Sequence, residues 1–97
     1  MIVVHDIFIA KAGNASKLAK LFKEVMEIGE DKVEIMTDMT GQFNKVIIVS
    51  RYESLSAYEK SWEKYSQDSE EMKKMKEKMK DYTDMYLTGS REIYRAW

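Results

Sequence analysis

The sequence contains a single histidine, His5, within an apolar stretch that runs from Ile2 to Ala10. An imidazole titrates near neutral pH, so His5 is a candidate proton acceptor if it lines a cavity. The alternative is a hydrogen-bonded histidine at an interface between two sheets. No metal site is expected, because the chain has no cysteine and no second histidine or carboxylate cluster with ligand spacing.

Three aromatic residues, Tyr58, Trp62 and Tyr65, follow one another at steps of four and three. This spacing places them on one side of any helix that they form. Such a stripe is more often part of a core, and we favour that interpretation. The alternative is that it forms the wall of a ligand pocket, since each phenol and the indole N–H needs a polar partner. Methionines at 72, 75 and 79 continue the stripe and predict further packing.

Arginines at positions 51, 91 and 95 fall in segments that we predict to be strands. A guanidinium group binds a carboxylate through two parallel hydrogen bonds, so Arg51, Arg91 and Arg95 are candidates for binding an anionic ligand together. The alternative is that they form ion pairs with acidic residues of neighbouring strands. The second interpretation is the simpler one.

The chain has 97 residues, which predicts one domain over 1–97. Sixteen Lys and Arg residues against seventeen Asp and Glu give a formal charge of −1, which predicts binding to neither nucleic acid nor an anionic membrane. No apolar run approaches the roughly 20 residues that span a bilayer. The first residues also lack the basic start of a signal peptide. We therefore expect a soluble cytoplasmic protein.

The first half of the chain predicts a strand, a helix and two further strands. Ile2–Ala10 is apolar and reads as a buried strand, and the next apolar residues recur with helical period from Ala15 to Ile28. Asn14 is predicted to cap that helix through its side chain, and Gly29 to end it. Lys32–Thr40 alternates like an edge strand, and Lys45–Glu53 is apolar on both faces like a central strand.

The second half predicts a broken helix and a last strand. Ser54 and Ser56 are alternative N-caps for the helix. Asp68, with Glu71 three residues later, provides a new start signal, so we expect a break near Gln67. Met85–Trp97 predicts a turn or bulge around Gly89 followed by a strand with Arg91, Ile93, Arg95 and Trp97 on one face.

The element order is β-α-β-β-α-β, which is typical of the ferredoxin-like α+β sandwich. We expect an antiparallel sheet of order 4-1-3-2 with helices on one face. The first and third strands are apolar on both faces, which leaves an apolar sheet face without a cover. Such a face exceeds what monomers usually expose, so we expect a homodimer in which two sheets close a barrel.

The element order, the helix "SLSAYEKSWEKYSQDSEE" and the last strand "SREIYRAW" resemble the dimeric α/β-barrel superfamily. Within it the chain is most similar to NIPSNAP-type proteins, with the antibiotic-biosynthesis monooxygenase group as a close alternative. The superfamily also includes haem-degrading enzymes, which use a histidine on the second helix and an asparagine on the first strand. This chain has neither residue, although Trp62 matches a tryptophan of that group. We expect no bound cofactor.

Two hypotheses about function follow from the residues and the resemblance. The first is a module that binds a small apolar or aromatic molecule between sheet and helices, with Tyr58, Trp62, Tyr65, Arg51 and Arg91 as its contacts. The second is a cofactor-independent oxygenase, or a related small-molecule enzyme, in which His5 is the proton acceptor and Trp62 a wall. The second hypothesis requires His5 and Trp62 to line one cavity.

Overall fold

The computed structural model describes residues 1–29 and 32–97, and its elements follow the predicted order. The second helical region is divided into two α-helices and a 3₁₀ segment, and a further 3₁₀ turn precedes the last strand. The elements are β1 (Ile2–Ala10), α1 (Ala15–Ile28), β2 (Glu34–Thr37), β3 (Lys45–Tyr52), α2 (Leu55–Ser61), η1 (Trp62–Ser66), α3 (Glu70–Lys78), η2 (Tyr82–Asp84) and β4 (Tyr86–Arg95).

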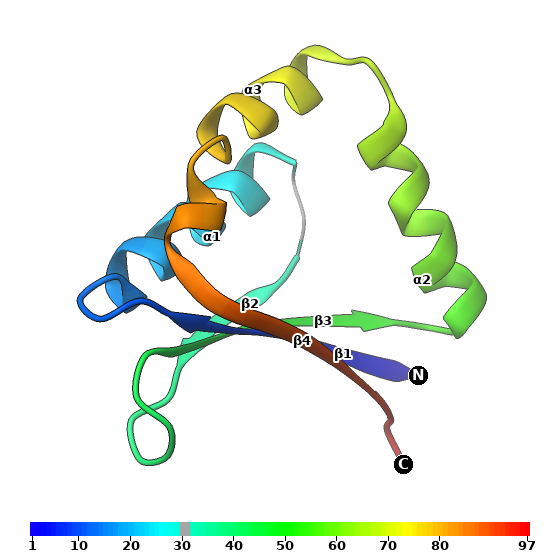
Figure 1. Ribbon diagram of the computed structural model, residues 1–97. Helices are drawn as coiled ribbons and strands as arrows, with labels where there is room; N and C mark the ends of the chain where they lie inside the picture. The colour runs from blue at the N-terminus through cyan, green and yellow to red at the C-terminus, as the bar shows by residue number, and fades with distance from the viewer. Residues whose placement is uncertain (30–31) are drawn as a thin grey trace.

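The four strands form one sheet of order β2-β3-β1-β4, with every neighbouring pair antiparallel. This confirms the predicted order 4-1-3-2 and the ferredoxin-like fold class. The apolar strands β1 and β3 lie in the centre because both of their faces are apolar. The helices lie on one side of the sheet, and the two chain ends lie near each other at one end of it (Figure 1).

The core lies between this sheet and α1. Leu18 and Phe22 of α1 are buried against Val46 and Ile48 of β3, as the helical period predicts. The Phe22 ring also packs on Phe8 of β1, with 4.9 Å between ring centroids. A second cluster joins α1 to α3 through Val25, Met72 and Met75. The two methionines on α3 are therefore packing residues, as predicted.

The helix starts correct two predictions about capping. Asn14 stands at the N-cap of α1, but its side chain makes no capping bond, and its backbone carbonyl accepts the N–H of Leu18. Ser54, of the two alternatives, caps α2 and accepts a hydrogen bond from the N–H of Ala57. Ser69 rather than Asp68 caps α3, so this helix begins one residue later than predicted. Hydroxyl and carboxylate caps are chemically similar, so the sequence alone did not separate them.

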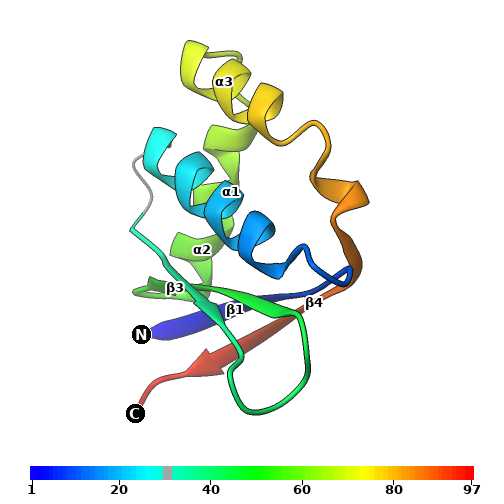
Figure 2. The same ribbon diagram turned by 90° about the vertical axis from the view of Figure 1, so that its left-hand side faces the viewer.

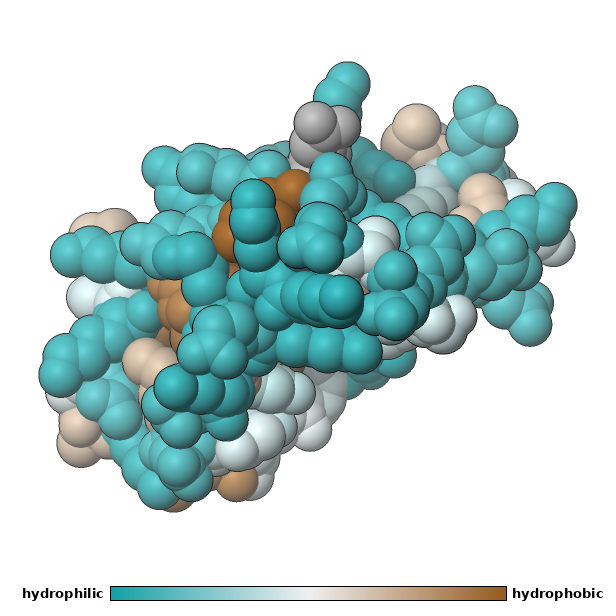
Figure 3. All heavy atoms as spheres, turned by 90° about the horizontal axis from the view of Figure 1, so that it is seen from above, coloured by the Kyte–Doolittle hydropathy of each residue, from teal (hydrophilic) through white to brown (hydrophobic). Residues whose placement is uncertain are grey.

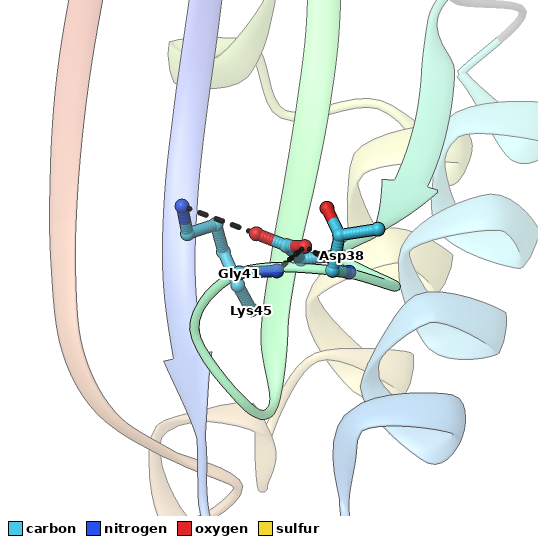
Figure 4. A network of polar contacts seen from close by, with 4 residues as sticks. Asp38, Gly41 and Lys45 are labelled. Atoms are coloured by element: carbon cyan, nitrogen blue, oxygen red, sulfur yellow. Dashed lines mark hydrogen bonds and ion pairs between the residues drawn. The ribbon is translucent and has the colours of Figure 1, made fainter.

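The edge strand β2 is shorter than the predicted Lys32–Thr40, because the chain turns at Asp38. The carboxylate of Asp38 accepts the N–H groups of Thr40 and Gly41 at 2.8 and 2.6 Å, and Lys45 lies 3.5 Å from its other oxygen (Figure 4). These backbone hydrogen bonds lower the pKa of Asp38 below its ordinary value of 3.8. A β-carbon on Gly41 would lie 2.6 Å from the Asp38 carboxylate, so a larger residue there would displace this carboxylate from its position in the turn.

The last strand corrects the prediction for Gly89. Gly89 is an ordinary strand residue paired with Phe8, and the strand begins earlier, at Tyr86. The irregularity lies nearer the start, where the register with β1 shifts between Ile9 and Ala10. The predicted alternation after Gly89 is confirmed for Arg91, Ile93 and Arg95, which pair with Asp6, Val4 and Ile2 on one face of the sheet, whereas Trp97 lies beyond the end of β4.

The second helical region forms an arch over the sheet, which we define as residues 55–78. α2 and η1 rise from the end of β3, the chain breaks at Gln67, and α3 returns across α1 (Figures 1 and 2). The predicted break is confirmed, because Gln67 has extended backbone (ψ 146°) after the 3₁₀ turn. Neither α2 nor η1 contains a buried residue, so this half of the arch stands away from the core.

Hydrophilic side chains cover most of the helical side, and hydrophobic residues show between them in limited areas (Figure 3). Among the described residues, no helix combines the length and apolar character needed to cross a bilayer. The opposite face of the sheet has a different character. Strand alternation places Val3, His5 and Ile7 there, and Ile47 of β3 is directly paired with Ile7.

Candidate functional site: a cavity beneath the arch

A cavity of about 410 Å³ lies between the arch, α1 and the covered face of the sheet. Its volume is at the lower end of the range typical of small-molecule sites. The sheet supplies a polar floor, α2 and η1 supply aromatic residues, and α1 and α3 supply apolar ones. The lining residues used below are Asp6, Phe22, Ser50, Tyr52, Tyr58, Trp62, Tyr65, Met72, Met75, Lys76 and Arg91.

The polar part of the floor is an ion pair between neighbouring strands. Asp6 of β1 and Arg91 of β4 are directly paired in the sheet, and Nε of Arg91 donates to Oδ1 of Asp6 at 2.5 Å. The side chain of Asp6 is 23% exposed and that of Arg91 is 43% exposed. The hydrogen bond to Asp6 raises the pKa of Arg91, so the guanidinium stays charged.

The aromatic wall is a chain of ring contacts that ends on this guanidinium. The centroids of Tyr52 and Tyr58 lie 5.1 Å apart, those of Tyr58 and Trp62 6.0 Å, and those of Trp62 and Tyr65 5.7 Å. Arg91 Cζ lies 5.0 Å from the Trp62 ring centroid and 5.9 Å from that of Tyr58. These are distances of a cation–π contact, which holds both the rings and the arginine in place.

Two features of this wall indicate a surface that is not fully packed. Trp62 is 46% exposed, which is unusual for the largest apolar side chain of a helix that faces a sheet. The hydroxyl of Tyr58 is buried but has no hydrogen-bond partner among the described residues. Buried phenol groups normally find a partner, because an unsatisfied one costs about 1–3 kcal/mol. The interpretation of the stripe as core is therefore wrong for Trp62, whereas Tyr65 packs against the cluster of Val25, Met72 and Met75, as that interpretation predicts.

The far part of the cavity is apolar. Met72 and Met75 of α3 and Phe22 of α1 line it, and methionine adapts its shape readily to an irregular neighbour. Tyr82 of η2 lies beside Phe22, and burial together with the adjacent Tyr86 raises the pKa of Tyr82 above its ordinary value of 10.0. These residues are uncharged, and α3 also contributes the charged Lys76 to the lining.

The structure brings together four of the six residues predicted for the site. Tyr58, Trp62, Tyr65 and Arg91 all line the cavity. Arg51 instead lies on the opposite face of the sheet, where it forms an ion pair with Glu34 at 2.6 Å. Arg51, Arg91 and Arg95 therefore do not converge on one ligand, and cross-strand pairing describes Arg51 and Arg91.

His5 also lies on the opposite face from the cavity. It follows the alternation of β1, in which Asp6 points under the arch and His5 points away from it. The imidazole contacts Tyr94 of β4 edge to face, with 5.3 Å between ring centroids. Within one chain, His5 and Trp62 do not share a cavity, so the geometry that the oxygenase hypothesis requires is absent from the single chain.

Sequence reasoning missed Asp6 and Tyr52 as site residues. The signal for Asp6 was present, because alternation places it on the same face as Val4 and Phe8, which the helices cover. A carboxylate on a covered face requires a partner, and this requirement points to an arginine of a neighbouring strand. The same alternation places Tyr52, the last residue of β3, on the covered face with Val46 and Ile48.

No group of three or more His, Asp or Glu side chains within residues 1–29 and 32–97 has the arrangement of a metal site. The cavity itself offers the ion pair, the Lys76 ammonium, the phenol groups and the apolar wall. These groups can bind, orient and desolvate a small molecule.

Comparison with solved structures identifies close neighbours in fold. An uncharacterized NIPSNAP domain protein from Burkholderia xenovorans has a TM-score of 0.80 at 14% identity, over 100% of this chain and 95% of its own. A NIPSNAP family protein from Agrobacterium tumefaciens has a TM-score of 0.76 at 17% identity, over 97% and 90%. An antibiotic biosynthesis monooxygenase has a TM-score of 0.66 at 11% identity, over 100% and 99%.

These neighbours confirm the resemblance drawn from the sequence, and they establish a shared fold. The identities are too low to transfer an activity, because one fold supports many functions. No family model and no curated protein sequence matches the chain. Function must therefore be argued from the cavity itself.

Proposed function

We propose that the protein is a module that binds a small apolar or aromatic molecule in the cavity beneath the arch. The observation that carries this proposal is the cavity of about 410 Å³, lined by aromatic and methionine side chains above one polar pair. Ligand sites are typically concave and mostly apolar, with a few polar groups that fix orientation. The half-exposed Trp62 and the unpartnered Tyr58 hydroxyl also support it, since a bound molecule would cover the first and pair with the second.

The binding test uses N-phenyl-1-naphthylamine, an uncharged apolar dye, and the fluorescence of Trp62. Trp97→Phe removes the other tryptophan, so that Trp62 reports alone. We expect saturable quenching of Trp62 by the dye. Ser61→Phe places a bulky side chain on the cavity wall and should weaken binding about tenfold or more, because the added ring takes up cavity volume beside Trp62. Lys60→Phe, one residue away and exposed, is the matched control and should change affinity less than about twofold.

Either of two results would reject the binding module. The first is dye binding that does not saturate, and the second is equal weakening by Ser61→Phe and Lys60→Phe. Circular dichroism of each variant separates loss of binding from loss of folding.

We place the protein in the cytoplasm in this proposal, in agreement with the composition.

We also propose that two copies associate through the uncovered sheet face. The apolar side chains at positions 3, 7, 9 and 47 lie on this face, and Met36 of β2 extends the same surface. Sedimentation velocity of the full chain should give a dimer. Ile47→Glu should shift it to a monomer, because it places a charge at the centre of the apolar face. Lys17→Glu on the exposed side of α1 should leave the dimer intact, and a wild-type monomer would contradict the proposal.

The second candidate is a cofactor-independent oxygenase or related enzyme, and a monooxygenase is among the neighbours in fold. Its proton acceptor would be His5, which lies across the sheet from Trp62. The single-chain geometry therefore favours the binding module.

A further inference from the structure

The hydrogen bonds of Arg91 leave part of its guanidinium group available to a ligand. Arginine carries five N–H donors in a planar fork. In this chain Nε of Arg91 donates to Asp6, and neither Nη group donates to any of the described residues. The Nη edge is the part that binds a carboxylate through two parallel hydrogen bonds.

The surroundings fix the position of this edge. Asp6 holds Nε from the neighbouring strand, and the rings of Trp62 and Tyr58 lie against the guanidinium. A group held on both sides loses little conformational entropy when a ligand binds. The arginine is therefore ready to accept an anion at the end of the cavity where the aromatic wall meets the floor.

The charges around the cavity favour an anion over a cation. Its charged lining residues are Asp6, Lys76 and Arg91, which together give a net charge of +1 among the described residues. Asp6 and Arg91 offset each other as an ion pair, so the excess positive charge is that of Lys76. The faces of Trp62 and Tyr58 that would attract a ligand cation already carry the guanidinium. A cationic ligand would thus meet the like charge of Arg91.

The buried hydroxyl of Tyr58 supplies a second donor at the same end. It has no partner among the described residues, and the Tyr58 ring contacts the Arg91 guanidinium. A carboxylate has acceptor positions for several hydrogen bonds, so it can satisfy both the phenol and the Nη edge. A purely apolar ligand would leave the phenol unsatisfied.

We infer that the ligand of this cavity is an apolar or aromatic carboxylic acid, bound as its anion. The carboxylate pairs with the Nη edge of Arg91 and accepts the Tyr58 hydroxyl, and the apolar part extends toward Met72, Met75 and Phe22. This inference rests on the proposed function, since it assumes that the cavity binds a small molecule. It adds the chemical class of that molecule and the residue that selects it.

The test compares three probes of equal chain length: octanoate, octanamide and octylammonium. Isothermal titration calorimetry with the full chain measures each affinity. A hydrogen bond to a charged group is the stronger kind, so octanoate should bind roughly tenfold to hundredfold more tightly than octanamide. Octylammonium should bind most weakly of the three.

Variants on one strand assign the preference to one residue. Arg91→Gln should reduce octanoate affinity to the level of octanamide and leave octanamide affinity unchanged. Arg95→Gln is the matched control, because Arg95 lies on the same strand and the same face but does not line the cavity. It should alter neither affinity. Tyr58→Phe should weaken octanoate by a smaller factor, since it removes a neutral donor alone.

If Arg91→Gln does not fold, because Asp6 is left without its partner, the double variant Asp6→Asn/Arg91→Gln replaces the ion pair by a neutral one. It should also lose the preference for octanoate. Equal affinities of octanoate and octanamide in the wild-type chain would overturn the inference and leave the binding module standing. A preference for octanoate over octanamide that survives in Arg91→Gln or in the double variant would also overturn the inference. Binding of none of the three probes would overturn both proposals.

Discussion

Among the described residues, each face of the sheet carries one arginine–carboxylate pair between neighbouring strands, and the two pairs differ in their surroundings. Arg51 and Glu34 meet on the uncovered face, with side chains 52% and 57% exposed. Arg91 and Asp6 meet under the arch, with side chains 43% and 23% exposed, and the guanidinium lies against Trp62. Water screens the first pair, whereas the second is partly removed from water. The same residue types thus make a surface contact on one face and a potential ligand contact on the other.

The comparison also explains why His5 is a weaker candidate than Asp6. The two residues are adjacent in β1, and the pleat of the strand sends them to opposite faces. His5 packs on Tyr94 among apolar residues, and Asp6 enters the cavity. By chemical type alone His5 is the better candidate for a site residue, but by position Asp6 is, because it lies in the cavity.

The largest difference in stability between the two faces should appear when two adjacent valines of β1 are each replaced by alanine. Val4 on the covered face is 0% exposed, and Val3 lies on the uncovered face. Val4→Ala should lower the free energy of unfolding by about 2–3 kcal/mol, because it removes buried methyl groups and leaves a void. Val3→Ala should cost less than about 1 kcal/mol at concentrations where the chain is monomeric. Thermal unfolding measures both, and equal losses would contradict the described difference between the faces.

The two ion pairs should differ in their contribution to the free energy of unfolding, by less than the two valines do. Asp6→Ala should lower the free energy of unfolding by about 1–2 kcal/mol, because it leaves the Arg91 charge partly buried without a partner. Glu34→Ala, the matched change on the uncovered face, should cost about 0.5 kcal/mol or less. Urea unfolding in dilute salt measures both. A cost for Glu34→Ala equal to that for Asp6→Ala would show that the arch does not alter the pair beneath it.

Asp38 lies in the turn outside both faces. Its replacement should have a smaller effect on stability, and this effect should depend on pH. Its pKa is lower in the folded chain than its ordinary value of 3.8, so the unfolded chain binds this proton more readily. The resulting stabilisation is fully present well above pH 3.8 and is lost as the pH falls through the folded-state pKa. Asp38→Asn keeps an oxygen for the N–H groups of Thr40 and Gly41 but removes the titration.

Unfolding of this variant should therefore depend less steeply on pH below about pH 4 than that of the wild-type chain. Asp68→Asn, at an exposed carboxylate beside the break of the arch, is the control and should keep the wild-type slope. An unchanged slope for Asp38→Asn would contradict the role given to the turn.

The smallest effect should come from replacing His5, and the property measured is the affinity for the dye. His5→Gln removes the imidazole on the uncovered face, and the sheet separates that face from the cavity. The affinity of N-phenyl-1-naphthylamine should therefore change less than about twofold. A dye titration that follows Trp62 fluorescence at a concentration giving one oligomeric state measures this. A large loss of affinity would mean that the two faces are coupled and would revive His5 as a site residue.

Much of the fold was predictable because its signals are local. The period of apolar residues gave the bounds of β1 and α1, and the double-sided apolar pattern placed β1 and β3 in the centre of the sheet. The break near Gln67 followed from a new start signal within the second helix. Predictions of single hydrogen bonds were less successful, as Asn14 and Asp68 show, because several polar residues near a helix start compete for the same N–H groups.

The site was only partly predictable because its parts come from distant segments. Tyr58, Trp62 and Tyr65 share a helix face by spacing alone, and all three line the cavity. Whether that face packs tightly or encloses a space depends on how far the arch stands from the sheet. Local periodicity does not specify this distance, so the sequence alone favours a core position for the whole stripe.

The sequence by itself determined the order of the elements, the face that each strand residue occupies and the central position of the two apolar strands. These follow from periods of two and 3.6 residues, which are properties of the backbone. The tertiary structure decided which side chains meet. Asp6 and Arg91 are 85 residues apart, and only the pairing of β1 with β4 under the arch brings them into one cavity. The physical reason is that strand register and helix placement depend on packing across the whole domain, which no short segment encodes.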